Sequence, residues 1–225
     1  MERTFLYHAL ASGVSGKITE PFQDLVEVQG ASAIPTTGGH SFSRVENFRY
    51  KDIFSFRSST TTTTGSFSDA KQRYTTSATV TIEGLDILSV VKADRVVARL
   101  VSEQPKNPEE GPVFTIAGSH FENLQVAGCR LPVRPDFGRL VDSWRPKKVD
   151  LRTVMTPLEL DPGWGLKMHL DGAIEVPEFG KVYLLEFLST PCYQSLTMLH
   201  LELGCPITGR ASVGHASTDG EFFPP

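Results

Sequence analysis

Two histidines in this sequence each have a carboxylate two residues further along the chain. His169 precedes Asp171 in the segment HLD, and His200 precedes Glu202 in the segment HLE. Residues two apart point to the same face of a β-strand, so each pair would present an imidazole and a carboxylate together. If the two strands are neighbours, these four side chains form the kind of set that binds zinc or iron. The alternative is a pair of solvated or hydrogen-bonded histidines, with no metal and no cofactor.

A second group of candidate functional side chains lies in a locally basic segment, residues 129–152. An indole beside several cationic side chains suits an acidic protein surface, a polyanion or a phosphate. The candidate partner patch consists of Arg139, Trp144, Arg145, Lys147 and Lys148. The alternative interpretation is a charged loop that is simply solvated.

Motifs for nucleotide binding and nucleophilic catalysis are missing from the sequence. It contains neither a Walker loop nor a dinucleotide fingerprint, and the segment GVSGK lacks the residue order of a nucleophile elbow. The three cysteines, Cys129, Cys192 and Cys205, include no C-x-x-C pair, which argues against a zinc ribbon or a thioredoxin-type site. We expect buried, reduced thiols and favour a protein without enzymatic activity.

The bulk composition is that of an ordinary globular protein. The chain has 225 residues, of which 40% are hydrophobic, and a formal net charge of −4. Nucleic-acid binding is not expected, because it needs a strong basic excess. No apolar run approaches the ~20 residues of a membrane-spanning helix. We expect one domain over residues 1–225, with a subdivision near residues 105–112 as the alternative.

The first residues of the chain make a poor secretion signal. Arg3 is the only early basic residue, and the apolar stretch that follows is short and interrupted by His8. A signal peptide has a basic region followed by a longer apolar one. We therefore predict a cytoplasmic location, with non-classical export as the alternative, and a first strand that begins at residues 5–10.

β-Strand patterns dominate the chain. Alternation is clearest where Ala78, Val80 and Ile82 are spaced by polar residues, which is the period of a half-buried strand. In residues 196–203, we expect Thr197, Leu199, Leu201 and Leu203 to form the core face. Strands are predicted over residues 41–50, 75–84, 94–103, 113–117, 123–126, 130–134, 166–170, 181–189 and 196–203. The predicted fold class is mainly β: a single antiparallel sandwich or barrel-like domain with few short helices.

Helical signals are few. Residues 21–29 allow a turn or two of helix, as do residues 137–144, and residues 85–96 fit either a helix or a strand. Fifteen prolines and nineteen glycines disfavour long helices.

Five consecutive threonines, residues 60–64, raise a separate question. Threonine is β-branched and favours strands, and aromatic residues flank the run on both sides. We interpret the run as an edge or surface strand whose hydroxyls face water, with an exposed hairpin tip as the alternative. An uncharged threonine edge is a template for pairing with another chain, so the run suggests self-association.

The segment SATVTIEGLDILSVVKADRVVARLVSE, followed by GSHFENLQVAG, resembles uncharacterised bacterial all-β proteins with a T-V-E-G-L…A-D-R-V-V-A core. It is also distantly similar to the repeats of choice-of-anchor-type surface proteins. The segment VPEFGKVYLLEF…LTMLHLELGCP looks like the C-terminal part of the same bacterial group. This resemblance implies an all-β bacterial protein and brings no catalytic motif.

Two functions are compatible with these patterns. The first is a non-catalytic bacterial structural or binding module that associates with itself through strand edges, as a homo-oligomer, or binds an unknown protein. The alternative is a β-barrel that encloses a small ligand, with possible isomerase, cyclase or hydrolase activity. Its interior would be lined by Phe5, Phe42, Phe48, Phe54, Tyr183 and Phe187, although the same aromatics suit an ordinary packed core.

Overall fold

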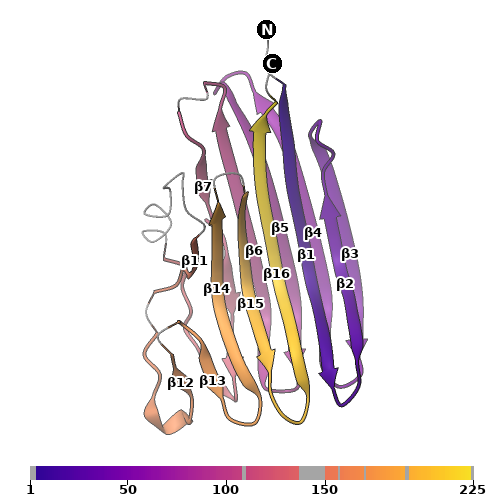
Figure 1. Cartoon of the computed structure of the whole chain (residues 1–225), viewed down its shortest axis with the longest axis vertical. Helices are drawn as coiled ribbons and strands as arrows, with labels where there is room; N and C mark the ends of the chain where they lie inside the picture. Colours follow the sequence, from indigo (N-terminus) through magenta and orange to yellow (C-terminus); the bar gives the residue numbers. More distant parts are fainter. Residues whose placement is uncertain are drawn as a thin grey trace.

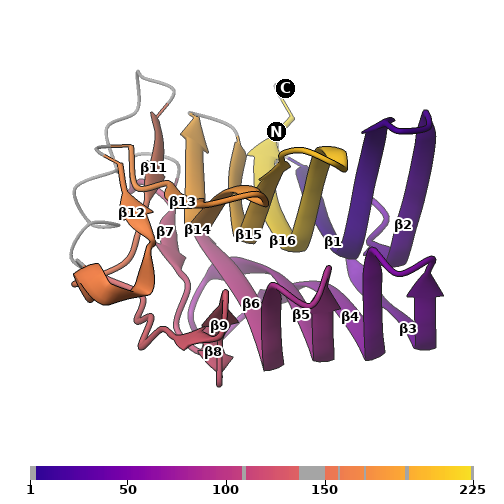
Figure 2. The same ribbon diagram turned by 90° about the horizontal axis from the view of Figure 1, so that it is seen from below.

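The fold is a sandwich of two antiparallel β-sheets that do not close into a barrel (Figures 1 and 2). The computed structural model describes residues 4–107, 110–136, 150–156, 158–169, 171–190 and 193–223. Within them, the helical content is a short 3-10 turn, η1 (Pro162–Trp164). The mainly β prediction and the sandwich are therefore confirmed. No helix in the described ranges is long and apolar enough to cross a membrane.

Sheet A forms the upper layer in Figure 2. Its order is β12-β13-β14-β15-β16-β1-β2, with β11 pairing with β14. The strands are β1 (Phe5–Glu20), β2 (Asp24–Ala33), β11 (Asp150–Thr153), β12 (Lys167–Met168), β13 (Ile174–Val176), β14 (Gly180–Thr190), β15 (Tyr193–Leu203) and β16 (Thr208–Phe222). The first and last strands of the chain lie side by side in the middle of this sheet.

Sheet B forms the other layer, in the order β10-β9-β6-β5-β4-β3, with β7 and β8 also pairing with β6. The strands are β3 (Gly39–Tyr50), β4 (Phe54–Ser68), β5 (Arg73–Ile87), β6 (Val91–Pro105), β7 (Val113–Thr115), β8 (His120–Glu122), β9 (Gln125–Val126) and β10 (Cys129–Arg130). The hydrophobic core lies between the two layers and includes Phe54, Leu100, Leu184 and Leu199, each at most 1% exposed.

Several sequence predictions need correction. Residues 21–29, predicted as a helical turn, contain most of β2, because the edge of sheet A pairs this segment with β1. Residues 85–96 are strand, turn and strand, and residues 130–134 are mostly outside strands. The helix predicted at residues 137–144 lies outside the described residues. Among the aromatics expected to face the interior, Phe42 is 56% exposed, because it points out from sheet B. Tyr183 also lies outside the core, on the outer face of sheet A, where its ring stacks on His200.

The threonine run is in an interior strand, and the edge prediction for it was wrong. It lies in β4, which pairs with β3 on one side and β5 on the other. Thr61 and Thr63 are fully buried between the sheets, and their hydroxyls find no hydrogen-bond partner in the described structure. On this side of sheet B, the edge strand is β3, the neighbour of β4.

Each sheet is crossed by one row of residues at which the alternation of buried and exposed side chains shifts by one position. Neighbouring strands keep the same register immediately before and after the row, but the row residues themselves are not bridged. The register of β1 with β2 shifts only beyond the row, between Val14 and Gly16. We call these the bulge rows, because a bulge likewise re-aims the side chains that follow it. The bulge row of sheet A consists of Leu185, Met198, Gly214, Gly13 and Gly30. The bulge row of sheet B consists of Asn47, Arg57, Gly84, Asp94 and Asn123.

Along both bulge rows, residues with positive φ alternate with residues without it. In sheet A these are Leu185 (53°), Gly214 (65°) and Gly30 (69°). In sheet B they are Asn47 (52°), Gly84 (64°) and Asn123 (51°). Glycine and asparagine adopt this region more readily than other residues, so the sequence suits five of these six positions.

The bulge rows correct one predicted core face. Leu199, Leu201 and Leu203 are buried as expected, but Leu196 and Met198 on the same strand are buried too. The alternation reverses at Met198, so even-numbered residues face the core before it and odd-numbered residues after it. His200 and Glu202 consequently lie on the outer face, as the sequence pattern predicted.

Candidate functional site

The structure places the four predicted metal ligands in separate polar contacts. The His169 ring nitrogen Nε2 lies 2.8 Å from Glu175 Oε2, and Asp171 accepts a hydrogen bond from the Ala173 amide. His169 and Asp171 do not share a strand face, because β12 ends at Met168 and a turn follows. Among the described residues, no group of three or more His, Cys, Asp or Glu side chains is placed to hold a metal ion.

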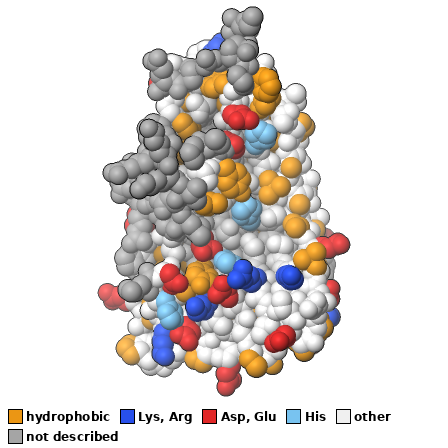
Figure 3. All heavy atoms as spheres, viewed as in Figure 1, with side chains coloured by type: hydrophobic (Ala, Val, Ile, Leu, Met, Phe, Trp, Pro, Cys, Tyr) orange, Lys and Arg blue, Asp and Glu red, His pale blue; other side chains and the backbone are white. Residues whose placement is uncertain are grey.

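His200 belongs instead to a polar cluster on the outer face of sheet A. Its Nδ1 lies 3.0 Å from Glu186 Oε2 on β14, and its ring stacks on Tyr183 with a centroid separation of 5.4 Å. Glu202 lies 3.7 Å from the Arg210 guanidinium and 3.5 Å from the Tyr183 hydroxyl, which donates to it. Figure 3 shows histidine and charged side chains gathered on this face.

Two pKa values in this cluster are shifted by its geometry. The hydrogen bond to Glu186 raises the pKa of His200 above its usual 6.5, against the opposing effect of burial. Burial, followed by the nearby charge of Glu202, raises the pKa of Tyr183. The raised pKa of His200 favours its protonated, charged form, and the raised pKa of Tyr183 favours its neutral phenol.

A groove of about 290 Å³ adjoins this cluster on the outer face of sheet A. His200, Lys17 and Arg210 contribute hydrogen-bond donors to its lining. Leu25 and Val28 add apolar surface on the β2 side. The arrangement can hydrogen-bond a polar group. Ser212, which also lines the groove, lies opposite His200 on the neighbouring strand, but the His200 ring contacts Glu186.

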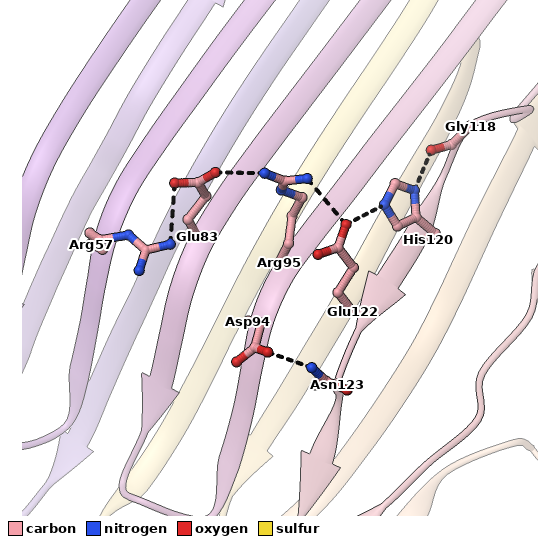
Figure 4. Close-up of polar contacts among 8 residues, drawn as sticks. All are labelled: Arg57, Glu83, Asp94, Arg95, Gly118, His120, Glu122 and Asn123. Atoms are coloured by element: carbon pink, nitrogen blue, oxygen red, sulfur yellow. Dashed lines mark hydrogen bonds and ion pairs between the residues drawn. The ribbon is translucent and has the colours of Figure 1, made fainter.

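A second polar network lies along the bulge row of sheet B and was missed by the sequence analysis (Figure 4). Arg95 donates to Glu83 at 2.9 Å and to Glu122 at 3.1 Å. Arg57 reaches the other Glu83 oxygen at 3.4 Å, and His120 lies 3.4 Å from Glu122. These contacts join four strands into a chain of alternating charge.

The same network explains the acidity of Glu83. The hydrogen bond from Arg95, followed by that from Ser58, lowers the pKa of this carboxyl. A cavity of about 360 Å³ lies among these charged side chains, but each cation already faces a carboxylate. The residues come from distant parts of the sequence. The signal available in the sequence was the adjacent charged pair Asp94 and Arg95. In the structure, these two consecutive residues of β6 both point outward.

The remaining predicted residues divide between described and undescribed parts of the chain. The partner patch Arg139, Trp144, Arg145, Lys147 and Lys148 lies outside the described residues, as does Cys192. Cys129 is half-buried and Cys205 is exposed. The expectation of buried thiols is therefore wrong for these two, because both lie at strand ends or in turns rather than in the core.

The two lateral edges of the sandwich differ in the length of their edge strands. At one end, sheet A finishes with β12 and sheet B with β10, each two residues long. At the other end, sheet A finishes with β2, of ten residues, and sheet B with β3, of twelve. Figure 2 shows β2 and β3 on the same side of the sandwich. The long free edges are therefore together.

The profile of a domain of unknown function, DUF8256, matches residues 5–157, more than half of the chain. The chain belongs to the DUF8256 family. The DUF8256 match contains the whole bulge row of sheet B and the free edges β2 and β3. It ends before β14, β15 and β16, which complete sheet A beside β1. No curated protein and no solved structure gives a significant match.

Proposed function

We propose that the chain is a non-catalytic structural or binding module that takes up a partner strand along the free edge of β3. The observation that supports this proposal is the length of that edge. β3 has twelve residues, and among the described residues it pairs only with β4, on one side. A long strand edge presents unpaired backbone groups that can bind another strand.

The composition of β3 also favours an edge that is used. Native edge strands are commonly protected by proline, by shortness, by a covering segment, by bulges or by charged side chains. β3 has only the last two, with Asn47 in the bulge row and the oppositely charged pair Arg44 and Glu46. The two opposite edges, β10 and β12, are protected by shortness, whereas β3 is long and contains no proline. Exposed apolar side chains accompany it: Phe42 on β3 and Leu25 and Val28 on β2 are 50–66% exposed.

The polar networks give less support to an enzymatic function. The ring of His200 is held by Glu186, and Arg57 and Arg95 of the sheet B network are held by carboxylates. The barrel that the alternative function requires is also not the fold observed, because the two sheets form an open sandwich with a packed core. The bacterial origin and the cytoplasmic location stay predictions.

Selection from a library of twelve-residue peptides against the immobilised full chain tests this proposal. Val45 packs against the core from the inner face of β3, so a lysine at this position can reach water only past the free edge. We therefore expect selected peptides to bind Val45→Lys at least tenfold more weakly. Thr79→Lys, on the outer face of the interior strand β5, is the matched control and should bind them normally. Peptides that bind both variants equally would place recognition elsewhere and contradict the proposal.

A further inference from the structure

The β3 sequence around Val45 is arranged so that it complements itself. The segment reads S-R-V-E-N, with Arg44 and Glu46 on either side of Val45. Both charged side chains are 56% exposed on the outer face, and the Arg44 guanidinium lies 2.5 Å from the Glu46 carboxylate. Reading the segment in reverse exchanges the two charges.

We infer that β3 pairs antiparallel with β3 of a second copy, around a two-fold axis at Val45. This inference rests on the proposed use of the β3 edge. In such a pair, Arg44 lies opposite Glu46 of the second copy, and Glu46 lies opposite Arg44 of the second copy. Opposite charges directly across an antiparallel pair are stabilising, and like charges are destabilising. The four side chains form a square of alternating charge on the outer face of sheet B.

The charges select this register over its neighbours. Moving the axis by one residue to Arg44 places the two arginines opposite each other. Moving it to Glu46 places the two glutamates opposite each other. Both alternatives keep the faces of the sheet but bring like charges together, which opposes pairing. The axis at Val45 is isologous, as two-fold interfaces must be, because each copy contributes the same residues.

The bulge row limits how far the regular pairing extends. Asn47 has φ of 52° and shifts the side-chain alternation of β3 after Glu46. With the axis at Val45, each Asn47 lies opposite Ser43 of the other copy. The two Asn47 residues therefore mark the two ends of a short paired segment. The interface is therefore centred on the charge square rather than on the full strand, and we expect a dimer that dissociates on dilution.

The same axis brings other exposed surface together. β2 and β3 lie on one side of the sandwich (Figure 2). A two-fold axis perpendicular to sheet B at its edge therefore also brings the β2 edges of the two copies toward each other. The apolar side chains Leu25 and Val28, exposed in the single chain, would then lie near the dimer interface. Burial of apolar surface adds to the strand pairing.

Sedimentation of the full chain with reversed charges tests the inference. Arg44→Glu alone and Glu46→Arg alone each place like charges across the axis twice. Each should raise the dimer dissociation constant at least tenfold. The double variant Arg44→Glu/Glu46→Arg exchanges the charges and should restore dimerisation. A mixture of the two single variants should form a heterodimer, because the all-acidic edge then faces the all-basic edge.

The mixing step also controls for folding, because only folded single variants can recover each other. Wild-type chain that sediments as a monomer at every concentration would overturn the inference. A dimer that is insensitive to the charge reversals would overturn it as well. If self-pairing fails while library peptides still require a free edge at Val45, the proposed function stands and only the second copy is excluded. If the peptides also ignore Val45→Lys, both fail.

Discussion

The bulge rows of sheets A and B use the same backbone device with opposite chemistry. In each, residues with positive φ alternate along the row and the strand register is preserved. All five residues of the sheet A row are buried, and all five residues of the sheet B row are exposed. The first row accordingly holds glycine, leucine and methionine, and the second holds asparagine, aspartate, arginine and glycine.

The packing of the two sheets explains why the residues of one row turn into the core and those of the other turn outward. A β-carbon added to Gly13 would lie 2.2 Å from the Ser59 hydroxyl, and one added to Gly214 would lie 3.5 Å from a Val96 methyl. Ser59 and Val96 each stand two residues beyond the sheet B row. The sheet A row therefore faces sheet B two residues beyond the sheet B row. The residues of the sheet A row turn into the core, and those of the sheet B row turn outward. Consecutive outward residues in sheet B raise the density of charge there, which produces the network around Arg95.

The largest expected effect separates a buried row glycine from an exposed one. Gly13→Ala places its β-carbon 2.4 Å from the Gln29 carbonyl oxygen as well as against Ser59, and the backbone of β2 cannot move away without breaking its pairing. We expect a loss of about 3 kcal/mol, the upper part of the range for overpacking. Gly84→Ala, exposed in the sheet B row, should lose only about 1–2 kcal/mol from its left-handed backbone. Urea denaturation measures both.

A serine-to-glycine change separates two causes of the Gly13 effect. When combined with Gly13→Ala, Ser59→Gly removes the side-chain clash but leaves the Gln29 carbonyl in place. The double variant should therefore recover only part of the free energy of unfolding that Gly13→Ala loses. Full recovery would show that the loss comes from the contact between the two sheets and not from the contact with the Gln29 carbonyl on the neighbouring strand. Equal losses at Gly13 and Gly84 would contradict the inward and outward assignment of the rows.

The strands were predictable from the sequence because alternation is local. Ala78, Val80 and Ile82 are all buried, as their spacing indicated. The bulge rows were not predictable, because each is a feature of several aligned strands. Within one strand, a row shows only as two adjacent residues that face the same side of the sheet. The threonine run was misassigned for a related reason: its composition shows that it is a strand but not where in the sheet it lies.

The candidate site was less predictable than the fold. His200 and Glu202 do share the outer face, as expected from their spacing. The partner of His200 is Glu186, fourteen residues earlier, which only the pairing of β14 with β15 brings close. The two-residue spacing of His169 and Asp171 failed, because Gly172 places these residues in a turn.

An intermediate effect is expected at the one row position where neither glycine nor asparagine occupies positive φ. Leu185 has φ of 53° and is fully buried. Leu185→Ala should lose about 2–4 kcal/mol through the cavity it leaves. Leu185→Gly leaves a larger cavity but releases about 1–2 kcal/mol of backbone strain, so it should be at least as stable as the alanine variant.

Leu184, equally buried and outside the row, is the matched control for Leu185. There the glycine variant should be less stable than the alanine variant by about 0.5–1 kcal/mol, the usual penalty for glycine in a regular element. Thermal or urea unfolding of the four variants gives the two differences. The same sign at both positions would mean that the sheet A row stores no strain at Leu185.

The smallest effect concerns two histidines on the outer face, beside the sheet A row. Burial lowers the pKa of His215, next to Gly214, whereas the Glu186 hydrogen bond raises the pKa of His200. The unfolded value is near 6.5 for both. His200 therefore contributes stability that is full below that value and is lost as the pH rises through its folded pKa. His215 contributes stability that is full above that value and is lost as the pH falls through its folded pKa.

The opposite pKa shifts of His200 and His215, which lie on neighbouring strands, can be checked by direct titration. Histidine ring resonances in NMR spectra should show His200 protonating above pH 6.5 and His215 below it. His215→Gln should flatten the fall in stability on acidification, and His200→Gln should remove the fall on the alkaline side. The surface variant His40→Gln is the control for the loss of one imidazole. If both histidines protonate on the same side of 6.5, the row does not bury His215 as the structure has it.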